Sequence, residues 1–224
     1  DPVTGQSLDA YQIGSSWSVK NYAMVGKSWG TLVGTGYVYN EDGSILVEDG
    51  IPVYEAGKEI GDVTPKWLAG FSNEFSYKDW SFVLIGFRLG GDIYSVTQAF
   101  GSQTGILKHT AEGDLRENGV VLGQNYMTDK VFKTADGKIN DVAVNAEDFF
   151  YNYYTICEMS VFDGSYLKLR EAHLTYNFPK SILEKTKCIK AAHVSLVGTN
   201  LALLWVHKSN IAHIDPESTS TGGD

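Results

Sequence analysis

The stretch "WLAGFSNEFSYKDWSFVLIGFRLGGD", residues 67 to 92, decides the fold class. The odd positions of its first half carry apolar side chains, namely Trp67, Ala69, Phe71, Phe75 and Tyr77, with a single break at Asn73. This alternation is typical of a strand with one apolar face. Alternation resumes after Lys78-Asp79, so we predict an antiparallel hairpin with a tight turn there. Each arm runs about ten residues, the length that a tilted strand needs to cross a bilayer.

The composition of the chain favours strands and turns. With 224 residues, 43% of them hydrophobic, the chain can bury the core of one large domain. Its 13 tyrosines, 10 phenylalanines and 24 glycines suit strands and turns better than helices, so we expect an all-β protein. The formal charge of -9 argues against a nucleic-acid partner, because neutralising phosphates needs a basic surface.

The two cysteines and the start of the chain give further limits. Cys157 and Cys188 have no metal-ligand spacing and form either one disulfide or two free thiols. Free thiols are favoured because a large β protein does not need the crosslink. No run of 18 apolar residues is present, which excludes a transmembrane helix. The start at Asp1-Pro2, without an initiator methionine or signal peptide, indicates a piece of a longer protein.

Long and short connections alternate along the predicted strands. We expect further strands at 26 to 40, 171 to 178 and 192 to 201, and a short amphipathic helix in "PKSILEKTK". Long loops are expected at 40 to 66, at 93 to 165 and in the tail from 206, and short connections at 78 to 79 and 179 to 190. One end of an up-and-down sheet would then carry all the long loops, which is typical of outer-membrane barrels.

Aromatic side chains gather beside the short connections. Tyr77 and Trp80 lie at one, and Tyr176 and Phe178 at the other, in the manner of an interfacial girdle. A soluble β-sandwich or jelly roll shares the alternation and the long loops, and it remains the alternative fold.

The alternation changes phase within "DGSYLKLREAHLTYNFP", residues 163 to 179. Apolar side chains occupy even positions from Ala172 to Phe178, but Lys168 and Arg170 are also even. Two hypotheses account for the change. Either the two cations face outward at the rim of a membrane, or a β-bulge near Arg170 exchanges the two faces.

The motifs of the chain do not predict an enzyme. "GKSWG", residues 26 to 30, matches the nucleophile elbow of hydrolases, but a strand rather than the required helix follows Ser28. His207 and His213 lack the spacing of a metal site. The acidic segment "YNEDGSILVEDG" lacks the spacing of a calcium loop. Two β-turns, at Asp42-Gly43 and Asp49-Gly50, explain its Asp-Gly pairs. We therefore expect no catalytic residues, cofactor or metal.

Several segments resemble one protein family in their order and style. They are "VGKSWGTLVGTGYVYNEDGSILVEDGIPVY", "FSYKDWSF", "GFRLGGDIYSVT", "DGSYLKLREAHLTYNFPKSILEKTK", "VSLVGTNLALLW" and "NIAHIDPE". From about Gly26 to Glu217 the chain resembles the C-terminal barrel region of the SusC/RagA family of TonB-linked outer-membrane proteins. The resemblance implies that residues 1 to 224 are a C-terminal section of a large transmembrane β-barrel with long extracellular loops, without the plug domain, TonB box and final strand.

The same resemblance implies a function in transport. Such proteins import nutrient oligomers, glycan or peptide, across the outer membrane of Gram-negative, Bacteroidetes-like cells. A SusD-like surface lipoprotein would cap the extracellular loops, and TonB would act through the absent N-terminal region. The alternative function is that of a soluble β-sandwich module that binds carbohydrate.

Aromatic residues of the long loop are the candidate contacts with substrate or lipoprotein. They are Tyr94, Phe149, Phe150, Tyr151, Tyr153 and Tyr154. Aromatic faces suit sugar rings and anchor interfaces. The alternative is that "DFFYNYY", residues 148 to 154, packs the long loop against its neighbours.

Overall fold

The computed structural model describes residues 9–78, 80–186 and 189–217, which divide into two compact units. The core unit comprises the described residues of 1–64, 91–163 and 209–224, and the sheet unit comprises those of 65–90 and 164–208. Most of the regular structure is β-strand, and nearly all of the strand pairs are antiparallel. The prediction of an all-β fold is confirmed.

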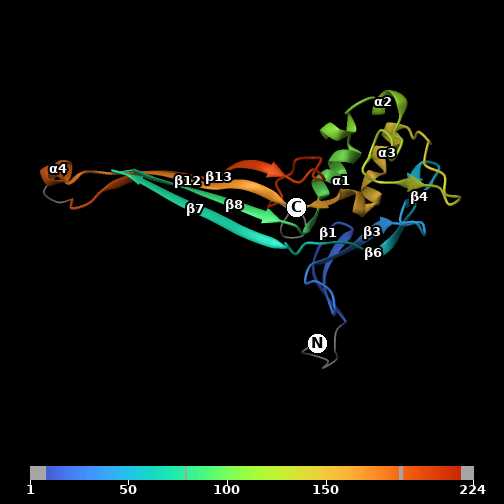
Figure 1. Cartoon of the computed structure of the whole chain (residues 1–224), viewed down its shortest axis with the longest axis horizontal. Coiled ribbons are helices and arrows are strands. Elements are labelled where there is room, and N and C mark those ends of the chain that lie inside the picture. The colour runs from blue at the N-terminus through green and yellow to red at the C-terminus, as the bar shows by residue number, and fades with distance from the viewer. Residues whose placement is uncertain (1–8, 79, 187–188, 218–224) are drawn as a thin grey trace. The chain divides into compact units, whose positions relative to one another are not determined.

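The sheet unit is one antiparallel sheet of four long strands, which lie side by side in Figure 1. Its order is β13 (His193–Val206), β12 (Tyr166–Asn177), β8 (Trp80–Leu89) and β7 (Trp67–Tyr77). The predicted hairpin is confirmed, because Tyr77 pairs with Trp80 across a two-residue connection. Lys78 has the positive φ of +55° that such tight turns require, and Asp79 lies outside the described residues.

The connection from β12 to β13 contains the expected short helix. α4 (Lys180–Leu183) continues into the 3-10 turn η4 (Glu184–Thr186). Leu183 is the buried residue of this helix. β13 extends beyond the predicted end at 201, because its last residues pair with β12 as far as Tyr166 opposite Val206.

The phase change in β12 coincides with an irregular register. Lys168 pairs with Gly86 and Glu171 with Leu84, so β12 takes three steps where β8 takes two. The extra residue near Arg170 agrees with the bulge hypothesis. The rim hypothesis is wrong for Lys168, whose side chain is buried rather than outward-facing.

The core unit contains a second antiparallel sheet and smaller strand pairs. The sheet has the order β1 (Ala10–Ser16), β2 (Val19–Met24), β3 (Thr31–Tyr37) and β6 (Tyr54–Asp62). The smaller strands are β4 (Ile45–Glu48), β5 (Ile51–Pro52), β10 (Phe132–Lys133), β9 (Asp92–Tyr94) and β11 (Val161–Asp163).

Two sequence predictions were wrong in the core unit. The strand expected at 26 to 40 extends only over β3, and the loop expected at 40 to 66 contains β4, β5 and β6. The sequence of β6 alternates only weakly between apolar and polar residues, but its backbone pairs with β3. The pairing runs from Thr31 opposite Asp62 to Tyr37 opposite Tyr54.

The stretch from 93 to 165 is also more ordered than the predicted loop. It contains helices α1 (Val96–Gln103), α2 (Leu115–Asn118) and α3 (Ala146–Tyr151) and the 3-10 turns η1 (Lys108–Thr110), η2 (Tyr153–Thr155) and η3 (Cys157–Ser160). The side chains of Ser95 and Asn145 cap α1 and α3 by accepting backbone N–H bonds. Elements this short bury few residues each, so they leave little periodicity in the sequence.

The hydrophobic core joins these helices to the first strands. Its largest fully buried side chains include Tyr37, Phe132, Tyr153, Leu32 and Leu122. Gly36 on β3 lets η3 approach, because a Cβ there would lie 2.8 Å from Oε2 of Glu158. That carboxylate accepts bonds from the Tyr37 N–H and the Tyr39 hydroxyl, both at 2.8 Å, and so ties η3 to β3.

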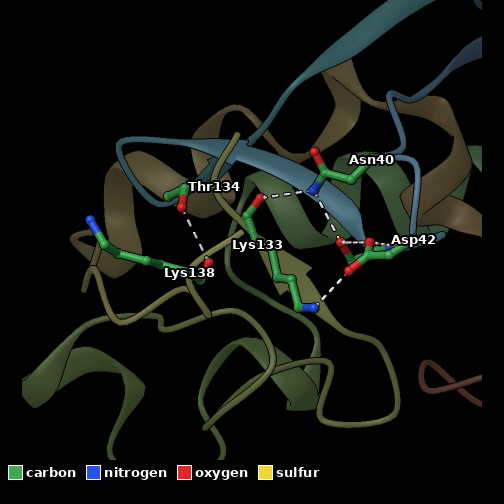
Figure 2. A network of polar contacts seen from close by, with 6 residues as sticks. Asn40, Asp42, Lys133, Thr134 and Lys138 are labelled. Atoms are coloured by element: carbon green, nitrogen blue, oxygen red, sulfur yellow. Dashed lines mark hydrogen bonds and ion pairs between the residues drawn. The ribbon is translucent and has the colours of Figure 1, made fainter. Parts of the chain in front are cut away.

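A polar network fixes the turn at Asp42-Gly43 to β10 (Figure 2). The Lys133 ammonium lies 2.6 Å from Oδ2 of Asp42, and Oδ1 of Asp42 accepts bonds from the N–H and hydroxyl of Ser44. Asn40 donates to the Ser44 hydroxyl and to the Lys133 carbonyl. Gly43 has a φ of +81°, so the predicted turn is confirmed.

Candidate functional site

A cavity of about 440 Å³ opens between the end of α1 and the helices α2 and α3 of the core unit. Its lining includes Gln103, Thr104, Arg116, Glu147, Phe150 and Tyr151. This volume falls within the range of about 300 to 1,000 Å³ that is usual for small-molecule sites. We call it the charged cavity, because the cationic side chain of Arg116 and the anionic side chain of Glu147 line it.

Local structure fixes each part of the lining. The Thr104 hydroxyl donates to the carbonyls of Phe100 and Gly101 and thereby closes the end of α1. Nη2 of Arg116 lies 3.4 Å from the Gly105 carbonyl on the same side. The Asn145 cap starts α3, which places Glu147 in the first turn of that helix.

Arg116 and Glu147 line the same cavity without neutralising each other. Neither residue belongs to an ion pair in the part of the chain that the structure describes. Both side chains are exposed, and the buried Phe150 lines the same cavity. The cavity therefore offers one positive and one negative group beside an apolar wall.

Three aromatic rings form what we call the aromatic shelf: Trp17, Phe100 and Tyr154. The Trp17 ring meets Phe100 edge-on at 4.9 Å between centroids, and Phe100 stacks on Tyr154 at 5.5 Å. Trp17 is 64% exposed and has a φ of +50°, an unusual conformation for so large a side chain. Phe100 precedes the cavity residues Gln103 and Thr104 by one helical turn, so these residues share a side of α1.

The structure separates the six predicted contact residues into two groups. Four of them are less than a tenth exposed, namely Tyr94, Phe149, Phe150 and Tyr153. α3 and η2 turn Phe149 and Tyr153 into the core, and β9 does the same for Tyr94, so packing explains the positions of these three rings. Phe150 packs in the core as well, but it also lines the charged cavity. Tyr151 is 61% exposed in the charged cavity, and Tyr154 belongs to the aromatic shelf. The contact role of the six residues stays a prediction.

Sequence patterns did not point to Trp17, Arg116 or Glu147. Trp17 lies in an ordinary polar stretch, "SSWS", and only the positive φ distinguishes it. Arg116 and Glu147 are 31 positions apart, and no spacing rule joins them.

His109 lies in the core behind the cavity and is surrounded by aromatic rings. The rings of Tyr126, Phe150 and Tyr153 lie within 6.3 Å of it, and its Nε2 lies 3.0 Å from the Ser102 hydroxyl. Burial lowers the pKa of His109 to about 4, so the ring is neutral at pH 7.

The residues of the rejected motifs have structural partners. β3 follows "GKSWG", and the Ser28 hydroxyl bonds to the Asp62 carboxylate at 2.9 Å and to the Thr64 hydroxyl at 2.8 Å. Within the described ranges no three His, Cys, Asp or Glu side chains gather as a metal site would require. Cys157 is buried with a free thiol, and Cys188 lies outside the described residues.

The sheet unit exposes large apolar side chains along both outer strands. On β7 these are Trp67, Leu68, Phe71, Phe75 and Tyr77, and on β13 they are Val194, Leu196, Val197, Leu201, Leu204 and Trp205. The register of β12 and β13 separates two faces at one end of the sheet: Leu174 pairs with Leu196, whereas Thr175 pairs with Ser195. The hydroxyls of the second pair lie 2.8 Å apart.

Among the described residues no helix is both long enough and apolar enough to cross a membrane. No protein-family model matches the chain. No curated protein matches it either.

Solved structures do resemble the chain. It is similar to a chain of the RagAB peptide importer in the closed-closed state, with a TM-score of 0.51, 18% identity, and coverage of 97% of this chain and 23% of that one. For the open-open state of that importer the TM-score is 0.49 at 17% identity, with coverage of 96% of this chain and 22% of that one. The chain therefore spans less than a quarter of the length of the solved chains, and at this identity the likeness to the closed-closed structure is one of fold.

Proposed function

We propose that this chain forms part of the barrel wall and the extracellular loops of a SusC-like outer-membrane transporter that imports nutrient oligomers, glycan or peptide. The observation that carries the proposal is the sheet unit with its exposed apolar side chains. A sheet in water would cover such side chains, whereas hydrocarbon solvates them.

The alternation of the two faces supports a place in a barrel wall. The face of Leu174 and Leu196 would meet lipid, and the face of Thr175 and Ser195 would meet the interior. Apolar residues outside and polar residues inside are the pattern of transmembrane barrels. In the whole protein, neighbouring strands would pair with β7 and β13, because unpaired edges invite aggregation.

The core unit would supply the extracellular loops. Its connections are long and well packed, and they carry the charged cavity and the aromatic shelf. The fold likeness to a chain of the RagAB peptide importer extends over both units, since it covers 97% of this chain. A SusD-like surface lipoprotein is the proposed partner over these loops.

Transport would proceed by gated passage rather than by chemistry. Substrate would be held among the extracellular loops until TonB, acting through another part of the protein, opens the path. The chain would need no cofactor and would act neither as an enzyme nor on nucleic acid.

Fractionation of Gram-negative cells that express the full-length protein tests this proposal. We expect the protein in the outer membrane, resistant to alkaline washing and requiring detergent for extraction. Leu196→Arg should reduce assembly, because a charge on the lipid face costs about 2 to 4 kcal/mol near the membrane centre. Ser195→Arg, one position away on the other face, is the matched control and should assemble normally. A monodisperse product in aqueous buffer without detergent would instead support a soluble carbohydrate-binding module.

A further inference from the structure

We propose that the charged cavity binds short peptides by their two charged ends, with Arg116 receiving the carboxylate and Glu147 the ammonium. This inference names the substrate class of the transporter and rests on the proposed function in that respect. The cavity itself is a binding site whether or not transport follows.

The separated charges are the first argument. An arginine and a glutamate line one cavity, and neither has an ion-pair partner among the residues that the structure describes. A zwitterionic ligand supplies both missing partners at once. The planar guanidinium of Arg116 can hold a carboxylate through two parallel N–H bonds.

The lining between the charges is the second argument. The ring of Phe150 forms an apolar wall, and the 61% exposed ring of Tyr151 offers a second surface. Gln103 and Thr104 add an amide and a hydroxyl at the end of α1. Apolar walls with a few polar groups suit the side chains and the backbone of a peptide.

The aromatic shelf extends this surface along α1. Trp17 holds a left-handed conformation that disfavours a bulky side chain, and its ring remains mostly exposed. Because Phe100 lies one turn before Gln103 and Thr104, residues of a longer peptide that leave the cavity can continue over the shelf.

The charges also disfavour a neutral oligosaccharide in the cavity. Hydroxyl groups would replace water around Arg116 and Glu147 without supplying opposite charges. A ligand with two opposite terminal charges matches both groups, which a neutral ligand does not. Peptide is therefore the favoured class, and glycan is the competing outcome of the test.

Calorimetric titration of the detergent-solubilised full-length protein tests the inference. The probes are tetraalanine, its N-acetylated form, its C-amidated form and maltotetraose. We expect tetraalanine to bind and each capped form to bind about tenfold more weakly, the effect of one lost charged hydrogen bond. Maltotetraose should not compete for the site.

Variants assign each end to its residue. Glu147→Gln should weaken binding of tetraalanine about tenfold and abolish the penalty of acetylation, while keeping the penalty of amidation. Arg116→Gln should also weaken binding of tetraalanine about tenfold, but it should abolish the penalty of amidation and keep the penalty of acetylation. Lys108→Gln and Glu112→Gln are matched controls, because these residues form an exposed ion pair outside the cavity lining and should leave binding unchanged.

The outcomes separate this inference from the proposed function. Equal binding of capped and free peptides, binding of maltotetraose alone, or no binding at all would overturn the peptide site, even in a protein that assembles in the outer membrane. If the protein needs no detergent but binds peptides through their charged ends, the inference of a peptide site stands and the proposal of a transporter is wrong.

Discussion

The core unit and the sheet unit differ in where their apolar side chains lie. The core unit contains both hydrophobic clusters of the described residues, with side chains such as Tyr37, Phe132 and Tyr153 almost wholly buried. The sheet unit buries Tyr166 and Leu183 but exposes tryptophan, leucine and phenylalanine along β7 and β13. One unit therefore forms its own interior, whereas the other leaves many of its apolar side chains exposed.

The difference shows that alternation of apolar and polar residues does not specify whether protein, lipid or water lies against the apolar face of a sheet. Strands with one apolar face occur both in sandwiches and in barrels, because period-2 patterning reports only that the two faces differ. What covers the apolar face depends on the rest of the molecule. In the core unit, helices and 3-10 turns from the stretch 93 to 165 cover β3 and β4.

Truncation of a buried phenylalanine in the core unit and of an exposed one in the sheet unit should give the largest difference in stability between the units. Phe132→Ala removes a ring that is 1% exposed and should lower the free energy of unfolding by about 3 to 5 kcal/mol. Phe71→Ala removes a ring that is 57% exposed and should cost far less. Denaturant titration of the full-length protein in detergent measures both. Equal losses would mean that the protein buries both rings alike.

The buried histidine should make the core unit sensitive to acid. Burial lowers the pKa of His109 to about 4 from an ordinary value of 6.5, so the unfolded chain takes up a proton below pH 6.5 before the folded chain does. Stability should therefore fall from pH 6.5 to pH 4, by roughly 3 kcal/mol from this group. It should not change above pH 7 on account of His109.

The control for this effect is substitution of the histidine. Unfolding of the His109→Gln variant, measured at pH 7 and pH 5, should depend less on pH than unfolding of the original protein. His193→Gln, at an exposed position of the sheet unit, is the matched control for the substitution itself. The same pH dependence in the His109→Gln variant as in the original protein would contradict the assignment.

Two glycines provide a smaller contrast between the units. Gly36→Ala would place a Cβ 2.8 Å from the Glu158 carboxylate and 3.0 Å from Ile60, and should cost about 1 to 3 kcal/mol through forced repacking. Gly70 in β7 has no atom within 4 Å of the corresponding Cβ, so Gly70→Ala should be nearly neutral. Thermal unfolding of the two variants checks the difference, and similar losses would argue against close packing of η3 on β3.

The smallest expected effect concerns the exposed ion pair in Figure 2. Asp42→Asn removes the ionic partner of Lys133 and should lower the free energy of unfolding only slightly, because solvent screens the pair. The loss should shrink in high salt. A salt-independent loss, seen by denaturant titration at two ionic strengths, would show that the hydrogen bonds from Ser44 matter more than the charge.

The sequence predicted the sheet unit better than the core unit. The hairpin at 67 to 92 was visible because long strands repeat their period several times. α1, α2 and α3 were missed, since helices of four to eight residues contribute about one turn or two of pattern. The buried position of Lys168 also escaped prediction, because the register shift that accompanies it depends on pairing with β8.

The candidate site was only partly predictable. Two residues of the aromatic segment 148 to 154, Phe150 and Tyr151, line the charged cavity. However, α3 and η2 turn most of that segment inward. Arg116 and Glu147 come together through tertiary packing, which no local pattern records.

Quenching by brominated lipid tests the central claim most directly. Fluorescent labels would be placed on single cysteines at positions 196 and 195. The background is the full-length protein with all of its native cysteines replaced by alanine, reconstituted into vesicles. We predict strong quenching at 196 and weak quenching at 195, because the two positions face opposite sides of β13. Weak quenching at both positions would contradict contact between the sheet unit and lipid.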